Sequence, residues 1–159
     1  MSLQGISFTE EDNVKNVCVV YRIRTDNLMA DEISTFLGIQ PTEAYSEGEI
    51  YMGKEFDPTS RRVTIKEKSR PFGIWNLDTR DLEPTSKRVH KHIEHVLSVL
   101  EPRFDKIKVY LDKPEKFTIS FYIQWSPLGE FGTYIISSNL MNRMHRLSHF
   151  TEFSFISPE

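Results

Sequence analysis

The chain has little cysteine, no long hydrophobic run and no excess of positive charge, and each absence excludes a class of protein. Its single cysteine, Cys18, cannot form an intrachain disulfide, which excludes a disulfide-stapled scaffold and favours a reducing compartment. No apolar stretch approaches the roughly 20 residues that a membrane-spanning helix needs. The formal net charge of −3 at pH 7 argues against a dedicated nucleic-acid-binding protein. We therefore expect a cytoplasmic protein whose partners are neither membranes nor nucleic acids.

What the chain does have is enough length and apolar material for one hydrophobic core. Its 159 residues fit one domain, and 38% of them are hydrophobic, with eleven phenylalanines, six tyrosines and two tryptophans. Residues 1–13 show no hydrophobic periodicity, so we expect a disordered arm or an expression scar there. Residues 14–159 are expected to form a single α+β domain.

The first third of the chain predicts a strand followed by a helix. Residues 17–23 are β-branched and aromatic, and both of their alternating faces are largely apolar, which indicates a central strand covered on both sides. Cys18 is expected to be a buried small hydrophobe rather than a nucleophile. A short amphipathic helix then ends at Gly38. Its apolar stripe is Met29, Ile33, Phe36 and Leu37.

The next segment has the weakest signals. We expect a strand over residues 42–52 that is interrupted by a turn, and a polar loop over residues 53–60. A half-buried strand follows, in which Val63 and Ile65 face the core. Its other face continues as a basic strip consisting of Arg62, Lys66, Lys68 and Arg70. We favour a charged edge strand over a binding strip for an anionic partner, and both interpretations stay open.

An aromatic strand and the main helical region come after this segment. The alternation of residues 71–79 sends Trp75 and Leu77 into the core, where the indole N–H needs a hydrogen-bond acceptor. Residues 89–100 predict the longest helix. Residues 106–111 fit either a helix or a strand, and we favour a second helix.

The C-terminal part completes the predicted order of elements. Residues 116–125 alternate as a strand with one core face, a helix capped by Ser137 or Ser138 follows, and residues 153–155 mark a last short strand. The order strand, helix, two strands, helix, strand predicts a ferredoxin-like β-α-β-β-α-β fold with an added C-terminal helix and strand. We expect its helices on one face of a mainly antiparallel sheet.

Short motifs in four places carry a family resemblance. They are residues 24–41, residues 45–48, the sequence GIWNL at 73–77, and residues 121–125 ahead of the glycines at 129 and 132. Together they resemble a bacterial family, domain of unknown function 4279, over roughly residues 17–156. Tyr45 departs from the family pattern, which has a tryptophan there. The resemblance implies a single α+β domain in a bacterial cytosol and implies no activity.

Residues with catalytic or metal-binding potential are few. His90, His92 and His95 do not share one face of a helix, because successive helical residues turn by about 100°, so we expect no metal site. Glu47 and Glu49 are expected to be solvated rather than a general acid and base. We therefore assign no catalytic residue, no metal ligand and no cofactor.

We expect a non-enzymatic binding module that recognises a protein partner or a small ligand through the hairpin of the second and third strands, by analogy with immunity proteins. The residues expected to bind are Tyr45, Tyr51, Arg62, Arg70 and Trp75, since tyrosine and arginine are favoured interface anchors. Two alternatives stay open. One is a small enzyme with a pocket between the sheet and the loop 127–138, and the other is a homodimer.

Overall fold

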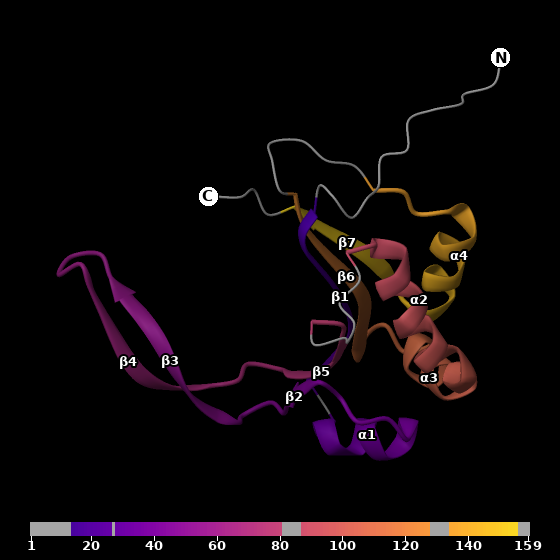
Figure 1. The fold of residues 1–159 in the computed structure, drawn as a ribbon. Helices are drawn as coiled ribbons and strands as arrows, with labels where there is room; N and C mark the ends of the chain where they lie inside the picture. Colours follow the sequence, from indigo (N-terminus) through magenta and orange to yellow (C-terminus); the bar gives the residue numbers. More distant parts are fainter. Residues whose placement is uncertain (1–13, 27, 81–86, 128–133, 156–159) are drawn as a thin grey trace.

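The structure, a computed structural model, describes residues 14–26, 28–80, 87–127 and 134–155 (Figure 1). The strands of the larger sheet are β1 (Val14–Thr25), β2 (Glu43–Tyr45), β5 (Gly73–Asp78), β6 (Phe117–Pro127) and β7 (Phe150–Phe155). A separate hairpin consists of β3 (Ile50–Asp57) and β4 (Arg62–Ser69). The helices are α1 (Ala30–Leu37), α2 (Val89–Leu100), α3 (Phe104–Leu111) and α4 (Ser138–Leu147), with a 3₁₀ turn, η1 (Glu101–Arg103). The arm or scar expected over residues 1–13 lies outside the described residues.

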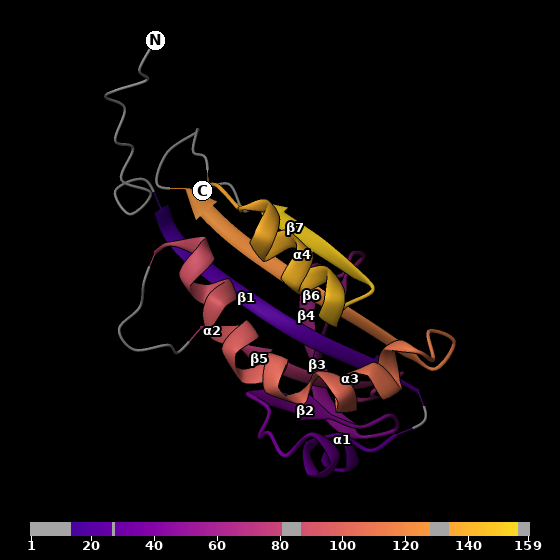
Figure 2. The same cartoon turned by 90° about the vertical axis from the view of Figure 1, so that its right-hand side faces the viewer.

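The larger sheet is built around β1, as predicted. Its strand order is β2-β5-β1-β6-β7, and every neighbouring pair is antiparallel except β6 and β7. Figure 2 shows α2, α3 and α4 together on one face of this sheet. The mixed α+β class is therefore confirmed. The strand count and order differ from the expected ferredoxin-like arrangement, because β3 and β4 leave the larger sheet and pair only with each other. The added C-terminal strand that was expected is β7, which pairs in parallel with β6.

Strand register decides which side chains enter the core. Tyr21 of β1 pairs with Leu77 and with Phe121, and all three side chains face the helices. The Tyr21 hydroxyl donates to the carbonyl oxygen of Leu147 over 2.9 Å, which ties the C-terminal end of α4 to the central strand. Trp75 is fully buried on the same face, as predicted, and its indole N–H donates to Ser34 Oγ over 3.0 Å.

The helices confirm most of the predicted periodicity. The apolar side of α2 is buried, and residues 106–111 are helical, as favoured. Ser137 caps α4 by accepting a hydrogen bond from the Leu140 N–H. Ile33 and Leu37 of the predicted core stripe are buried, but Met29 and Phe36 are exposed. Met29 precedes the helix, and Ala30 and Ser34 complete the buried side of α1.

The predictions for β3 and β4 were wrong in two respects. The expected loop over residues 53–60 is mostly strand, since β3 continues to Asp57. The expected half-buried strand is exposed along its length, with Val63 and Ile65 open to solvent. Alternation identified the strand correctly, but a strand that pairs only with its hairpin neighbour has no core to pack against.

We predict that Trp75→Ala destabilises the protein by about 3–5 kcal/mol, because it leaves a large cavity and removes the hydrogen bond that the Ser34 hydroxyl accepts from the indole. Urea unfolding followed by circular dichroism measures this. Met52→Ala on the exposed hairpin is the control and is expected to change stability by less than about 0.5 kcal/mol. Equal losses for the two variants would contradict this assignment of the core.

Candidate binding surface

The hairpin β3–β4, residues 50–69, projects away from the larger sheet and is called the arm below (Figure 1). Directly paired residues of antiparallel strands point to the same side, so the register gives the arm two different faces. The polar face carries Tyr51, Gly53, Glu55, Asp57, Arg62, Thr64, Lys66 and Lys68. The apolar face carries Ile50, Met52, Lys54, Phe56, Val63, Ile65, Glu67 and Ser69.

An arginine clamps the arm to the sheet. The guanidinium carbon of Arg70 lies 3.9 Å from the ring centroid of Tyr45 and 3.8 Å from that of Tyr51. Tyr45 belongs to β2 of the sheet and Tyr51 to β3 of the arm, so the two rings hold the guanidinium between them. Such cation–π contacts contribute about 0.5–1 kcal/mol each at exposed sites. The clamp therefore fixes the direction in which the arm leaves the sheet.

Backbone hydrogen bonds brace the same junction. The Gly48 N–H donates to the Arg70 carbonyl, and the Arg70 N–H donates to the Glu49 carbonyl, both over 2.9 Å. Gly48 has a φ of +79°, a left-handed conformation that glycine adopts without a Cβ penalty, so the predicted turn is confirmed. Ser46 Oγ accepts the N–H of Ala30 over 3.1 Å, which joins this turn to the first residue of α1.

The face of the sheet opposite to the helices continues from this junction and is called the open face. Among the described residues, no helix covers it (Figures 1 and 2). A row of hydrogen bonds crosses three strands there: Arg22 Nε donates to Asn76 Oδ1, and Asn76 Nδ2 donates to Glu43 Oε2, each over 3.1 Å. Arg24 is the next residue of β1 on this face, and its guanidinium carbon lies 3.8 Å from the centroid of the Phe72 ring. The open face therefore presents arginines held in fixed positions.

Two titratable groups on the open face have shifted pKa values. Partial burial opposes ionisation of Asp78, yet the hydrogen bonds and charge of Arg80 hold the pKa of this carboxyl below its usual range. Burial raises the pKa of the Cys18 thiol, and the negative charge of Asp78 raises it further. Cys18 is buried, as predicted, and its thiol is not activated as a nucleophile.

The structure brings three of the five expected binding residues together. Tyr45, Tyr51 and Arg70 form the clamp, and all three are half-buried. Arg62 lies at the far end of the arm, opposite Asp57. Trp75 points to the helices, and its complete burial leaves it no surface for a partner.

Sequence reasoning missed the contribution of β1 to this surface. Arg22 and Arg24 alternate with core residues, so their parity alone could have placed them on the face opposite to the helices. A strand covered on both faces, as expected for β1, would leave neither arginine at a surface. Cys18 and Val20, on the same parity, are buried, whereas Arg24 is exposed.

One histidine of α2 links this helix to the sheet. His92 is buried, and its Nδ1 lies 2.6 Å from Thr79 Oγ1, which also accepts the N–H of Val19. The hydroxyl thereby links α2 to β1. Within the described ranges, no group of three or more histidine, cysteine, aspartate or glutamate side chains is placed to hold a metal.

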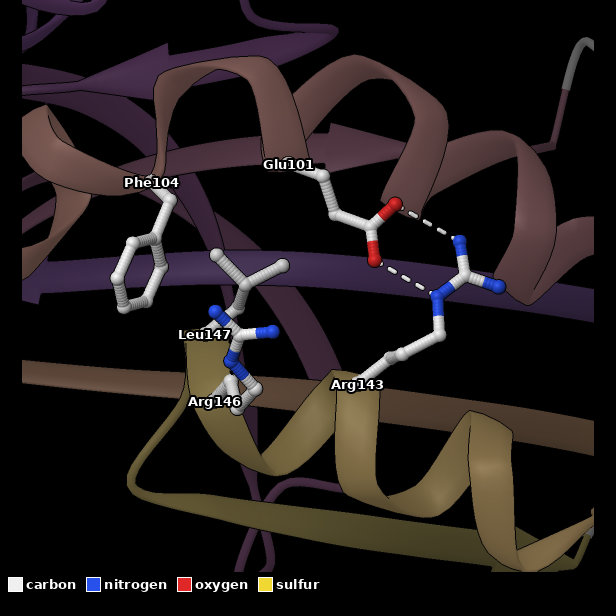
Figure 3. A pocket seen from close by; sticks show the side chains of 5 residues that line it. All are labelled: Glu101, Phe104, Arg143, Arg146 and Leu147. Atoms are coloured by element: carbon white, nitrogen blue, oxygen red, sulfur yellow. Dashed lines mark hydrogen bonds and ion pairs between the residues drawn. The ribbon is translucent and has the colours of Figure 1, made fainter.

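A pocket of about 170 Å³ lies between η1, α3 and α4 (Figure 3). Glu101 and Arg143 face each other across it and form two hydrogen bonds of 2.7 and 2.8 Å. These bonds hold the pKa of Glu101 below its usual range. Arg146 lies 5.0 Å over the ring of Phe104. Residues 128–133 of the loop expected to line an enzyme pocket lie outside the described residues.

The fold and surface define a mixed α+β domain with an exposed hairpin arm. The chain belongs to the family described as Domain of unknown function (DUF4279), whose model matches residues 15–154. Comparison with curated proteins and with solved structures found no significant match to either. In the part of the chain that is described, no helix is both long and apolar enough to cross a membrane.

We predict that Arg70→Ala loosens the arm, because it removes both cation–π contacts of the clamp while it retains the backbone hydrogen bonds. Hydrogen–deuterium exchange at the amides of β3 and β4 should become faster, while exchange in β1 and β6 stays unchanged. Lys66→Ala, which removes only an exposed ion pair with Glu55, is the matched control. Unchanged exchange in Arg70→Ala would show that the clamp does not hold the arm.

Proposed function

We propose that this protein is a binding module that captures a protein partner on the continuous surface formed by the polar face of the arm and the open face of the sheet. The observation that carries the proposal is the clamp. Because Arg70 contacts one ring from each part, it joins the two faces into a single surface of fixed geometry. Preorganised tyrosine and arginine side chains are effective interface anchors, since little freedom is lost when a partner binds.

The shape of this surface favours a protein over a small ligand. Each arm strand has eight residues, which corresponds to a length of about 26 Å at the rise of an antiparallel strand. Small-molecule sites are enclosed clefts that surround most of the ligand. An extended ribbon beside an open sheet face instead matches the dimensions of a protein interface.

Charge favours a partner that presents carboxylates. The arm has five basic and three acidic residues, which gives it a net charge of +2. Since the whole chain has a net charge of −3, the residues outside the arm have a net charge of −5. Arg62, Lys66 and Lys68 lie along the polar face and lead towards Arg70. A basic arm on an acidic body attracts acidic partners and disfavours basic ones. This supports the binding-strip interpretation of the basic segment.

The carboxyl groups with shifted pKa values support binding rather than catalysis. The alternative function, a small enzyme, requires a pocket in which polar groups with perturbed pKa values point towards one another. Asp78 and Glu101 have lowered pKa values, and an arginine pairs with each of them. A carboxylate that is ionised and paired with arginine is a poor general acid or base at neutral pH.

We also propose that the elements β1, α1, β2, β5, α2 and β6 form a ferredoxin-like core into which the arm is inserted between β2 and β5. The antiparallel order β2-β5-β1-β6 supports this relationship. The buried free thiol of Cys18 supports a reducing, cytoplasmic setting. A module of immunity-protein type would use such a surface to capture one dedicated protein.

The test is partner capture by variants of the polar surface. We predict that Arg62→Glu combined with Arg70→Glu reduces capture at least tenfold in pull-downs from the source cell, measured by quantitative mass spectrometry. Circular dichroism checks that the variant stays folded. Lys106→Glu, an exposed charge reversal on α3, is the matched control and should capture the same protein as the unmodified chain. An identical capture profile for the double variant would overturn the proposal.

A further inference from the structure

The apolar face of the arm is the largest unexplained feature of the surface. Five hydrophobic side chains on this face are 56% to 65% exposed. They are Ile50, Met52, Phe56, Val63 and Ile65. Contiguous exposed apolar residues of this kind mark interaction surfaces. In the described part of the chain, β3 and β4 form extensive contacts only with each other. The body of the protein therefore does not cover this face.

The clamp also determines which way the apolar face points. Tyr45 lies on the open face of the sheet, in register with Ile74, and Tyr51 lies on the polar face of the arm. Since both rings contact Arg70, the polar face of the arm is the one that adjoins the sheet. The apolar face is turned away from the sheet and is accessible to another molecule. It is distinct from the surface proposed above for the partner.

Isolated two-stranded ribbons are marginally stable in water, and a further layer packed on their apolar face stabilises them. The charges on this face indicate what that layer is. Its charged residues are Lys54 on β3 and Glu67 on β4, at adjacent register positions. One charge of each sign on a largely apolar face is a self-complementary arrangement.

We propose that the apolar faces of two arms from two copies of this chain pack against each other about a twofold axis, forming a homodimer. On this face, each residue of β3 and its paired residue of β4 form one row across the arm, which gives four rows in all. The two inner rows are Met52 with Glu67 and Lys54 with Ile65. A twofold axis across the middle of the arm reverses the order of the rows. Each Lys54 then faces the row that holds Glu67 of the partner copy, and Ile50 faces the row of Phe56 and Val63.

Packing of two such faces about 10 Å apart brings the lysine and glutamate side chains within reach of each other while the apolar side chains interdigitate. By symmetry the interface contains two lysine–glutamate pairs. The contact involves two eight-residue strands from each copy, so we expect a weak dimer that dissociates on dilution.

Charge reversal provides the test, with sedimentation velocity of the full chain over a range of concentrations as the measurement. In Lys54→Glu, both intermolecular pairs become glutamate–glutamate, and in Glu67→Lys both become lysine–lysine. Each variant alone is expected to raise the dimer Kd about tenfold or more. An equimolar mixture of the two variants restores opposite charges at both pairs, so heterodimers should form at concentrations where each variant alone is monomeric.

Lys66→Glu is the matched control, since it reverses the same charge on the polar face and should leave the dimer Kd unchanged. Ile65→Asp should abolish association, while circular dichroism reports an intact body. A monomer at all concentrations for the unmodified chain would overturn the proposal, and so would charge variants that associate as the unmodified chain does. Dimerisation that Ile65→Asp does not weaken would place the interface elsewhere and would also contradict the proposal.

Discussion

The register of β1 against β5 and β6 is the constraint on which the rest of the structure depends. It places Tyr21 and Ile23 under the helices and sends Arg22 and Arg24 to the open face. A slip of one residue would exchange these two sets, which would bury two arginines and expose the core. The Tyr21 hydroxyl bond to the Leu147 carbonyl and the Asn76 bridge to Arg22 each require this register. The core and the open face are therefore specified together by one strand.

The arm depends on that sheet for its direction but contributes nothing to the core. Its attachment consists of the Arg70 clamp and the backbone bonds that Arg70 makes with Gly48 and Glu49. The rest of the arm keeps an apolar face in water, which is unfavourable for an isolated ribbon. Such a face is retained where another molecule covers it in the working state. The two faces of the arm thus suit two different contacts, a polar one that is continuous with the sheet and an apolar one that is complementary to itself.

Much of the fold could be predicted from the sequence, because local periodicity carries the required information. The alternation around Trp75 places Trp75 and Leu77 in the core, the helical spacing in α2 reports burial on one side of the helix, and the structure agrees on both points. Residues Val63 and Ile65 show the limit of this reasoning. Alternation indicates a strand with one apolar face but does not say whether that face meets a core, since this depends on which strands pair. The sequence identified Tyr45, Tyr51 and Arg70 as candidate binding residues, but it did not predict that they contact each other. They meet only because the chain returns from the arm to the sheet at Arg70.

We propose that the arm serves recognition and not folding, and an exchange of the arm separates these two roles. Residues 50–69 would be exchanged for a two-residue turn between Glu49 and Arg70, and thermal unfolding, self-association and partner capture would be measured on the same preparation. We expect a nearly unchanged midpoint of thermal unfolding together with the loss of both self-association and partner capture. A shortened chain that fails to fold, or one that still dimerises and captures the partner, would contradict it.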